Sequence, residues 1–131
     1  MEAAAIIALL LADARVKAIA GDRVHFVRAP QGLPRPYGLL ARASGTTDYT
    51  NEGASGLGTA RLQLDGYGES YKSANDLLEA MLAVVDGFRG ERSGITFKGI
   101  FIDSRRDLPA SDSGNVTPLF RRSADIIIWF S

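Results

Sequence analysis

The segment "RLQLDGYGESYKSANDLLEAMLAVVDGF", Arg61–Phe88, decides the fold class because its hydrophobic period changes part-way along. Up to Gly68, apolar Leu62 and Leu64 alternate with polar residues, which is typical of a strand with one buried face. After Ser70, apolar residues recur three and four positions apart, which indicates an amphipathic helix that Ser70 can cap. A strand followed at once by a helix predicts a domain built from both. The apolar face of this helix is expected to contain Tyr71, Ala74, Leu78, Met81, Val85 and Phe88.

The same two periods predict the elements on either side. An apolar run near the N-terminus predicts a helix over residues 2–19, with a break near Asp13 and a glycine after its end. Hairpin-length links between most strands favour an antiparallel sheet. The prediction is an α+β fold in one domain, residues 1–131: an antiparallel (mixed at most) sheet of about five strands with two helices packed on it, in the order α-β-β-β-α-β-β. The expected strands are 23–28, 37–44, 57–68, 94–108 and 118–131.

The two long strands carry further signals. In the first, Gly99 is expected to form a bulge that leaves Phe97 and Ile100 on the same face. In the second, every other residue from Phe120 to Phe130 shares one face, while Ile127 and Trp129 leave the other face partly apolar. Two apolar faces predict either a central strand or a strand covered by a neighbouring subunit.

The stretch "APQGLPRP", residues 29–36, carries three prolines between two expected strands. One interpretation is an exposed polyproline ligand, and the other is an ordinary connection between strands. Its place inside a domain, with Pro36 directly before a strand, favours a rigid connection. Arg35 is then expected to be exposed and available to a neighbouring subunit.

Composition limits the functional classes. The 15 basic and 15 acidic residues give a net charge of zero, which argues against a dedicated nucleic-acid-binding protein. There is no cysteine and only one histidine, His25, so zinc motifs are excluded. The uncharged run "AAAIIALLLA" is too short to span a bilayer, and no membrane association is expected.

Candidate chemistry is limited to one acidic pair. Asp103 and Asp107, with Asp112 in the following loop, could serve hydrolysis or bind a cation, but no companion base or nucleophile accompanies them. The alternating charges of residues 103–107 fit a solvated strand edge or a set of ion pairs between subunits better. We therefore expect neither catalytic residues nor a cofactor or metal, and no enzymatic activity.

Several segments, in order along the chain, resemble one family. They are "VKAIAGDRVHFVRAPQG", "RPYGLLARASG", "ARLQLDGYGESYKSANDL", "VVDGFRG", "GIFIDSRRDL" and "FRRSADIIIWF". Together they resemble the tail completion, or tail terminator, proteins of long-tailed bacteriophages and of phage-derived gene transfer agents. The resemblance covers nearly the whole chain, although glycine stands at position 38, where relatives tend to carry a bulky residue.

The resemblance implies a structural protein of a virion or phage-like particle, assembled in the bacterial cytoplasm. Such proteins form a ring, typically a hexamer, at the head-proximal end of the tail. The ring stops growth of the tail tube and binds the head-closure or connector protein, and DNA passes through its lumen without sequence-specific binding. The alternative is a small stand-alone module of a non-viral system that binds a protein or peptide.

A ring needs surfaces for its neighbours and partners. Long loops at residues 45–55 and 109–117 and the polar positions of the two long strands are the expected contact regions. The candidate interface residues are Arg35, Asp48, Tyr49, Arg105, Arg106, Asp107, Arg121, Arg122 and Trp129.

Overall fold

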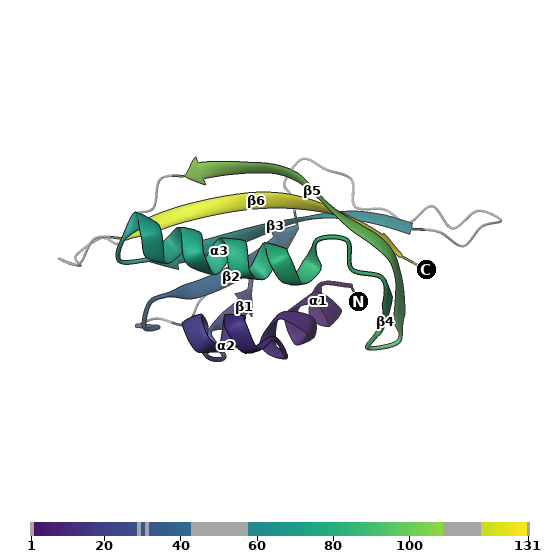
Figure 1. Cartoon of the computed structure of the whole chain (residues 1–131), viewed down its shortest axis with the longest axis horizontal. Coiled ribbons are helices and arrows are strands. Elements are labelled where there is room, and N and C mark those ends of the chain that lie inside the picture. The colour runs from purple at the N-terminus through teal and green to yellow at the C-terminus, as the bar shows by residue number, and fades with distance from the viewer. Residues whose placement is uncertain (1, 29, 31, 43–57, 109–118, 131) are drawn as a thin grey trace.

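A computed structural model describes residues 2–28, 30, 32–42, 58–108 and 119–130. Its helices pack on one face of a six-stranded sheet, which confirms the predicted α+β class (Figure 1). The helices are α1 (Glu2–Leu11), α2 (Ala14–Ala20) and α3 (Tyr71–Val85). The strands are β1 (Val24–Phe26), β2 (Tyr37–Arg42), β3 (Gly58–Gly68), β4 (Gly90–Arg92), β5 (Ile95–Leu108) and β6 (Phe120–Phe130).

The strand order across the sheet is β1-β2-β3-β6-β5-β4. β6 therefore lies in the middle, paired antiparallel with β3 and with β5, which agrees with its two apolar faces. The sheet is mixed, because β1 and β2 run parallel. The proline-containing stretch is confirmed as the link between these two strands. It is not a hairpin, because β1 and β2 run parallel.

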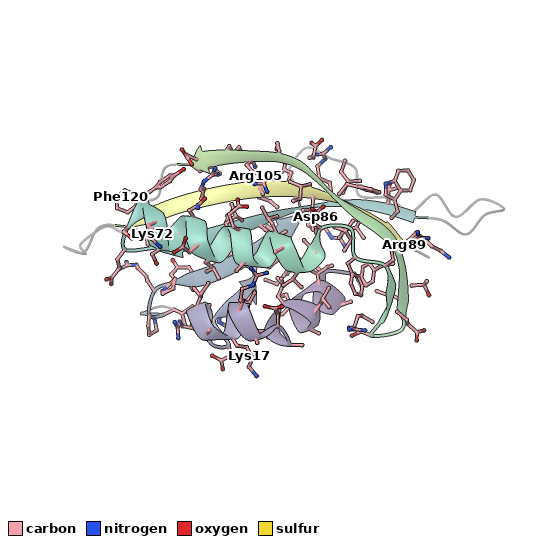
Figure 2. The ribbon with its side chains drawn as sticks, in the orientation of Figure 1. Lys17, Lys72, Asp86, Arg89, Arg105 and Phe120 are labelled. Carbon is pink, nitrogen blue, oxygen red and sulfur yellow. The ribbon has the colours of Figure 1, made fainter. Side chains whose placement is uncertain are left out.

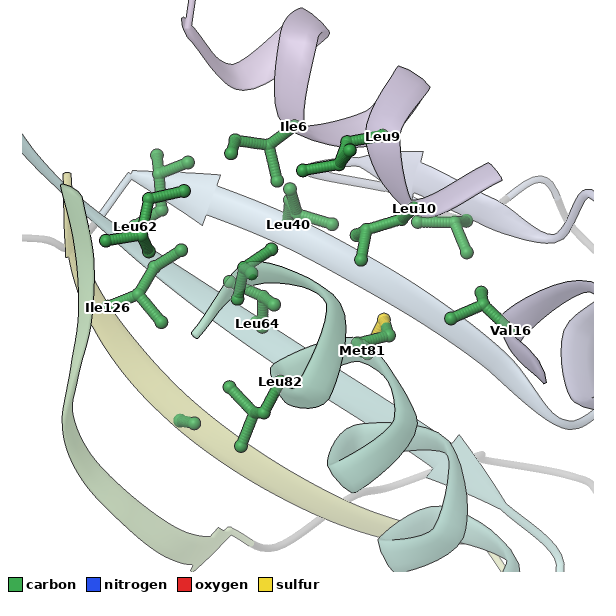
Figure 3. Packing of buried hydrophobic residues seen from close by; sticks show 14 of the residues in the cluster. Ile6, Leu9, Leu10, Val16, Leu40, Leu62, Leu64, Met81, Leu82 and Ile126 are labelled. Atoms are coloured by element: carbon green, nitrogen blue, oxygen red, sulfur yellow. The ribbon is translucent and has the colours of Figure 1, made fainter. Parts of the chain in front are cut away.

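The hydrophobic core lies between the sheet and the helices (Figure 3). Leu62 and Leu64 of β3 belong to this buried cluster, as the alternation predicted, together with Met81 and Leu82 of α3. α1 adds Ile6 and Leu10 to the same cluster. The Ser70 hydroxyl accepts a hydrogen bond from the backbone N–H of Ser73, so the predicted helix cap is confirmed.

Three local predictions need correction. The described residues form three helices, because the Asp13 carboxylate accepts hydrogen bonds from the N–H groups of Arg15 and Val16 and so begins a new helix at the expected break. A sixth strand, β4, pairs with the start of β5. Tyr71 is exposed on the first turn of α3 and does not belong to its buried face.

The bulge at Gly99 is confirmed. The pairing of β5 with β6 shifts between Phe97 and Gly99, which leaves Phe97 and Ile100 both buried under the helices. In the ranges given above, no helix is both long and apolar enough to cross a membrane.

Candidate assembly surface

The face of the sheet that no described helix covers, here called the open face, carries most of the polar side chains of the long strands. Pairing of β3 with β6 places Gln63 beside Asp125 and Asp65 beside Ser123. β5 adds Arg106 beside Ser123. Period-two alternation sends these residues away from the helices. The open face is therefore polar over most of its middle.

Asp65 is the centre of this polar region. Its carboxylate receives hydrogen bonds from Arg121 at 2.7 and 3.1 Å and from the amide of Gln63 at 3.0 Å. The hydroxyl of Ser123 donates a short hydrogen bond to the same carboxylate. Asp65 and Ser123 are both buried, although they lie on the helix-free side. The side chains around them supply the cover that helices supply on the other face.

The polar region continues toward β5. Arg106 donates to the Gln63 amide oxygen at 2.9 Å and to Asp125 at 3.2 Å. Arg61 bonds Asp103 at 2.6 Å and lies 3.6 Å from Asp125. We call the connected set the open-face network. It consists of Arg61, Gln63, Asp65, Asp103, Arg106, Arg121, Ser123 and Asp125.

Two tyrosines flank this network beside β2. The rings of Tyr37 and Tyr67 stack with centroids 4.8 Å apart, and the Arg121 guanidinium lies 5.6 Å from the Tyr67 centroid. Burial, reinforced by the Asp65 carboxylate and opposed by Arg121, raises the pKa of Tyr67 to about 12. This end of the open face holds the phenol in its neutral form.

A second polar group joins the helix-covered side of the sheet to α3. Arg105, labelled in Figure 2, lies on the long strand above α3. It makes a two-pronged ion pair with Glu79, with nitrogen–oxygen distances of 2.9 and 3.1 Å. The Tyr71 hydroxyl donates to Asp107 at 3.2 Å and accepts from Arg122 at 3.0 Å. These contacts are exposed and link α3 to the long strands.

The structure separates the predicted interface residues. Arg106 and Arg121 belong to the open-face network, whereas Arg105, Asp107 and Arg122 face α3. All five therefore have partners within the subunit. Their roles between subunits remain predictions.

The other predicted residues are scattered. Trp129 is exposed on the open face at the far end of β6. Asp48 and Tyr49 lie outside the described residues. Arg35 is not exposed as expected, because its side chain is only 11% accessible and approaches Glu69 at 4.0 Å.

Sequence reasoning missed Asp65, Gln63 and Ser123, which connect the arginines. The alternation in β3 placed Gln63 and Asp65 on the polar face. However, Ser123 is 58 positions from Asp65, and only the β3–β6 register brings them together. Phe101, exposed on β5, was also missed.

The charged side chains of the open face neutralise one another within the subunit. Three arginines and three aspartates of the open-face network are paired with one another. Among the described residues, no group of histidine, aspartate or glutamate side chains could hold a metal ion.

Comparison with known proteins identifies the class as structural proteins of phage-type particles. The family model for "Tail completion protein gp17" matches residues 4–131, and the chain belongs to this family. The predicted resemblance to tail completion proteins is thereby confirmed, and the chain is a structural protein of the particle tail.

A solved structure shares the fold. A chain from the "Virion of native gene transfer agent (GTA) particle" aligns with a TM-score of 0.75 at 16% identity, covering 97% of this chain and 92% of that chain. No curated protein matches the sequence.

Proposed function

We propose that the chain is a tail terminator. Its copies close into a ring, expected to be a hexamer, at the head-proximal end of the tail tube. The ring ends growth of the tube and binds the head-closure or connector protein. DNA passes through the lumen without sequence-specific contact.

The family match over residues 4–131 carries this proposal. The open-face network supports it because a neutral face of this kind suits the wall of the DNA channel. A channel through which DNA moves must not hold the phosphates, because each phosphate contact made by a cation adds affinity. The arginines of the open face are already neutralised by aspartates of the same subunit.

Deletion of the gene from a particle-producing strain tests the proposal. We expect electron microscopy to show filled heads without tails and free tails with tubes of irregular or excessive length. The wild-type gene supplied in trans should restore joined particles. Normal infectious or transducing particles without the protein would overturn the proposal and favour a stand-alone binding module.

A further inference from the structure

The two edges of the sheet differ from each other. β4 pairs with Ile95–Phe97 of β5, and the Gly87 N–H donates to the Ile100 carbonyl at 2.8 Å. Within the described residues, the outer side of β5 from Phe101 to Leu108 therefore has no partner strand. At the opposite edge, β1 pairs only with β2. Unpaired edges offer backbone N–H and C=O groups to another strand. A subunit with two unlike edges suits head-to-tail contacts, which close into rings.

The β5 edge carries an exposed aromatic side chain. Phe101 is 54% exposed and lies next to Ile127 of β6 on the open face. Its ring covers Gly99, where an added Cβ would come within 3.1 Å of the ring. Trp129, paired with Gly99, is 38% exposed. The open face beside this edge therefore carries an apolar patch made of Phe101, Ile127 and Trp129.

The β1 edge carries an exposed aliphatic side chain in a strained backbone. Val27 follows β1 directly, is 59% exposed and has φ +72°. Its N–H still donates to Leu40 at 2.6 Å, which holds it to the end of the sheet. A β-branched residue rarely adopts this backbone conformation, and such strain is kept mainly at functional positions.

Charges beside these two apolar residues are complementary. Arg28, next to Val27, is exposed, and no side chain in the described part of the chain pairs with it. Asp103, two positions after Phe101, keeps a large part of its side chain exposed although Arg61 binds one oxygen. A cation beside one edge and an anion beside the other favour a second copy as the occupant.

We propose that the β1 edge of one copy lies against the β5 edge of the next. In this contact Val27 packs on Phe101, Arg28 lies near Asp103, and backbone hydrogen bonds extend the sheet from subunit to subunit. The inference rests on the proposed ring and names the contact that closes it.

Directed cross-linking tests this contact, since the native chain contains no cysteine. The variant with both Val27→Cys and Phe101→Cys is assembled into particles and treated with a short bismaleimide. We expect most of the monomer to convert into a ladder of linked copies larger than a dimer. Each single-cysteine variant has one thiol per copy and should stop at the monomer or dimer.

The matched control combines Val27→Cys with Phe120→Cys. Phe120 is an exposed phenylalanine like Phe101, with 40% against 54% of its surface accessible. It begins β6 and so lies at the opposite end of that strand from Trp129 and the apolar patch. No ladder is expected from it. If Val27→Cys prevents assembly, Arg28→Cys replaces it, with the same expected ladder.

Two outcomes would overturn the inference. One is joined particles that contain the variant and yield no ladder, which would leave the proposed function intact. The other is a cross-link from the Phe101→Cys thiol to a different particle protein, which would show that a second copy is not the occupant. Failure of the proposed function is detected separately, by normal particles in the deletion strain.

Discussion

Asp65 and Tyr67 show how single residues depend on the open face. The Asp65 carboxylate is almost fully enclosed and is neutralised by Arg121. Removing one member of a fully buried pair costs about 3–5 kcal/mol, because the other charge loses its partner. The cost is smaller here, because the Arg121 side chain is 25% exposed. The charges of this pair act on Tyr67 in opposite directions, since the Asp65 carboxylate raises the pKa of its phenol and the Arg121 guanidinium lowers it.

Tyr67 gives a prediction for alkaline pH. Burial raises its pKa to about 12 in the folded protein, while tyrosines of an unfolded chain titrate near pH 10. The folded state therefore holds this proton more tightly. Its contribution to stability is fully present below about pH 10 and is lost as pH rises through about 12.

Urea unfolding from pH 8 upward, together with phenolate absorbance, measures this effect. The variant Tyr67→Phe should lose the late-titrating phenol and show a shallower decrease in stability over that range. Tyr71→Phe is the matched control, since it removes one exposed phenol, and the decrease should be shallower in Tyr67→Phe than in this control. Equal slopes in all three proteins would contradict the assignment.

At the scale of the elements, β3 and α3 approach each other at Gly66 so closely that no side chain fits between their backbones. A Cβ at Gly66 would lie 2.6 Å from the Ala74 carbonyl oxygen and 3.1 Å from the Leu78 nitrogen. Both are backbone atoms of α3, so relief requires the helix to move. Glycine at this position therefore sets the distance between the helix and the sheet.

The substitution Gly66→Ala should destabilise the protein by about 3 kcal/mol or more, because overpacking here meets backbone rather than a flexible side chain. Thermal or urea unfolding measures the change. The matched control is Gly99→Ala, another strand glycine. Its added Cβ meets only the ring of the exposed Phe101 at 3.1 Å, and this ring can turn away. Equal losses in the two variants would show that α3 adjusts freely.

Sequence predicted the elements that have a clear local period. The alternation before Gly68 located β3 to within one residue, and the Ser70 cap located the start of α3, although the helix ends at Val85 and does not reach Phe88 as predicted. β4 was missed because Gly90–Arg92 is three exposed residues with no hydrophobic period. The parallel pairing of β1 and the open-face network depend on register between distant strands, which local patterns do not contain.

At the scale of the whole molecule, the charges of the open-face network sum to zero, as those of the whole chain do. Arg61, Arg106 and Arg121 are matched there by the three aspartates of the network. An isolated basic sheet face would attract duplex DNA at low salt. The pairing within the subunit removes that attraction.

Replacing Asp103 and Asp125 by asparagine tests this balance. The double variant keeps side-chain shape but leaves three arginines with one aspartate on the open face. We expect it to bind mixed-sequence duplex DNA, by fluorescence anisotropy, about tenfold or more tighter than wild type at low salt, with the gain lost as salt rises.

The control is Asp76→Asn with Asp86→Asn, which makes the same change in net charge at two exposed positions, one on α3 and one directly after it. A smaller gain is expected from it. Equal affinities of the two variants would mean that total charge, rather than the open face, governs contact with DNA.

The central place of β6 has a consequence for synthesis. β3, α3 and β5 leave the ribosome before β6, yet β3 and β5 are joined to each other only through β6. Until Phe120–Phe130 emerges, the nascent chain holds two strands that lack their shared neighbour and a helix whose apolar side is only partly covered. Such intermediates expose apolar surface and strand edges that favour aggregation. The speed with which this one strand inserts therefore sets how long each new copy is exposed to misassociation before it can join a particle.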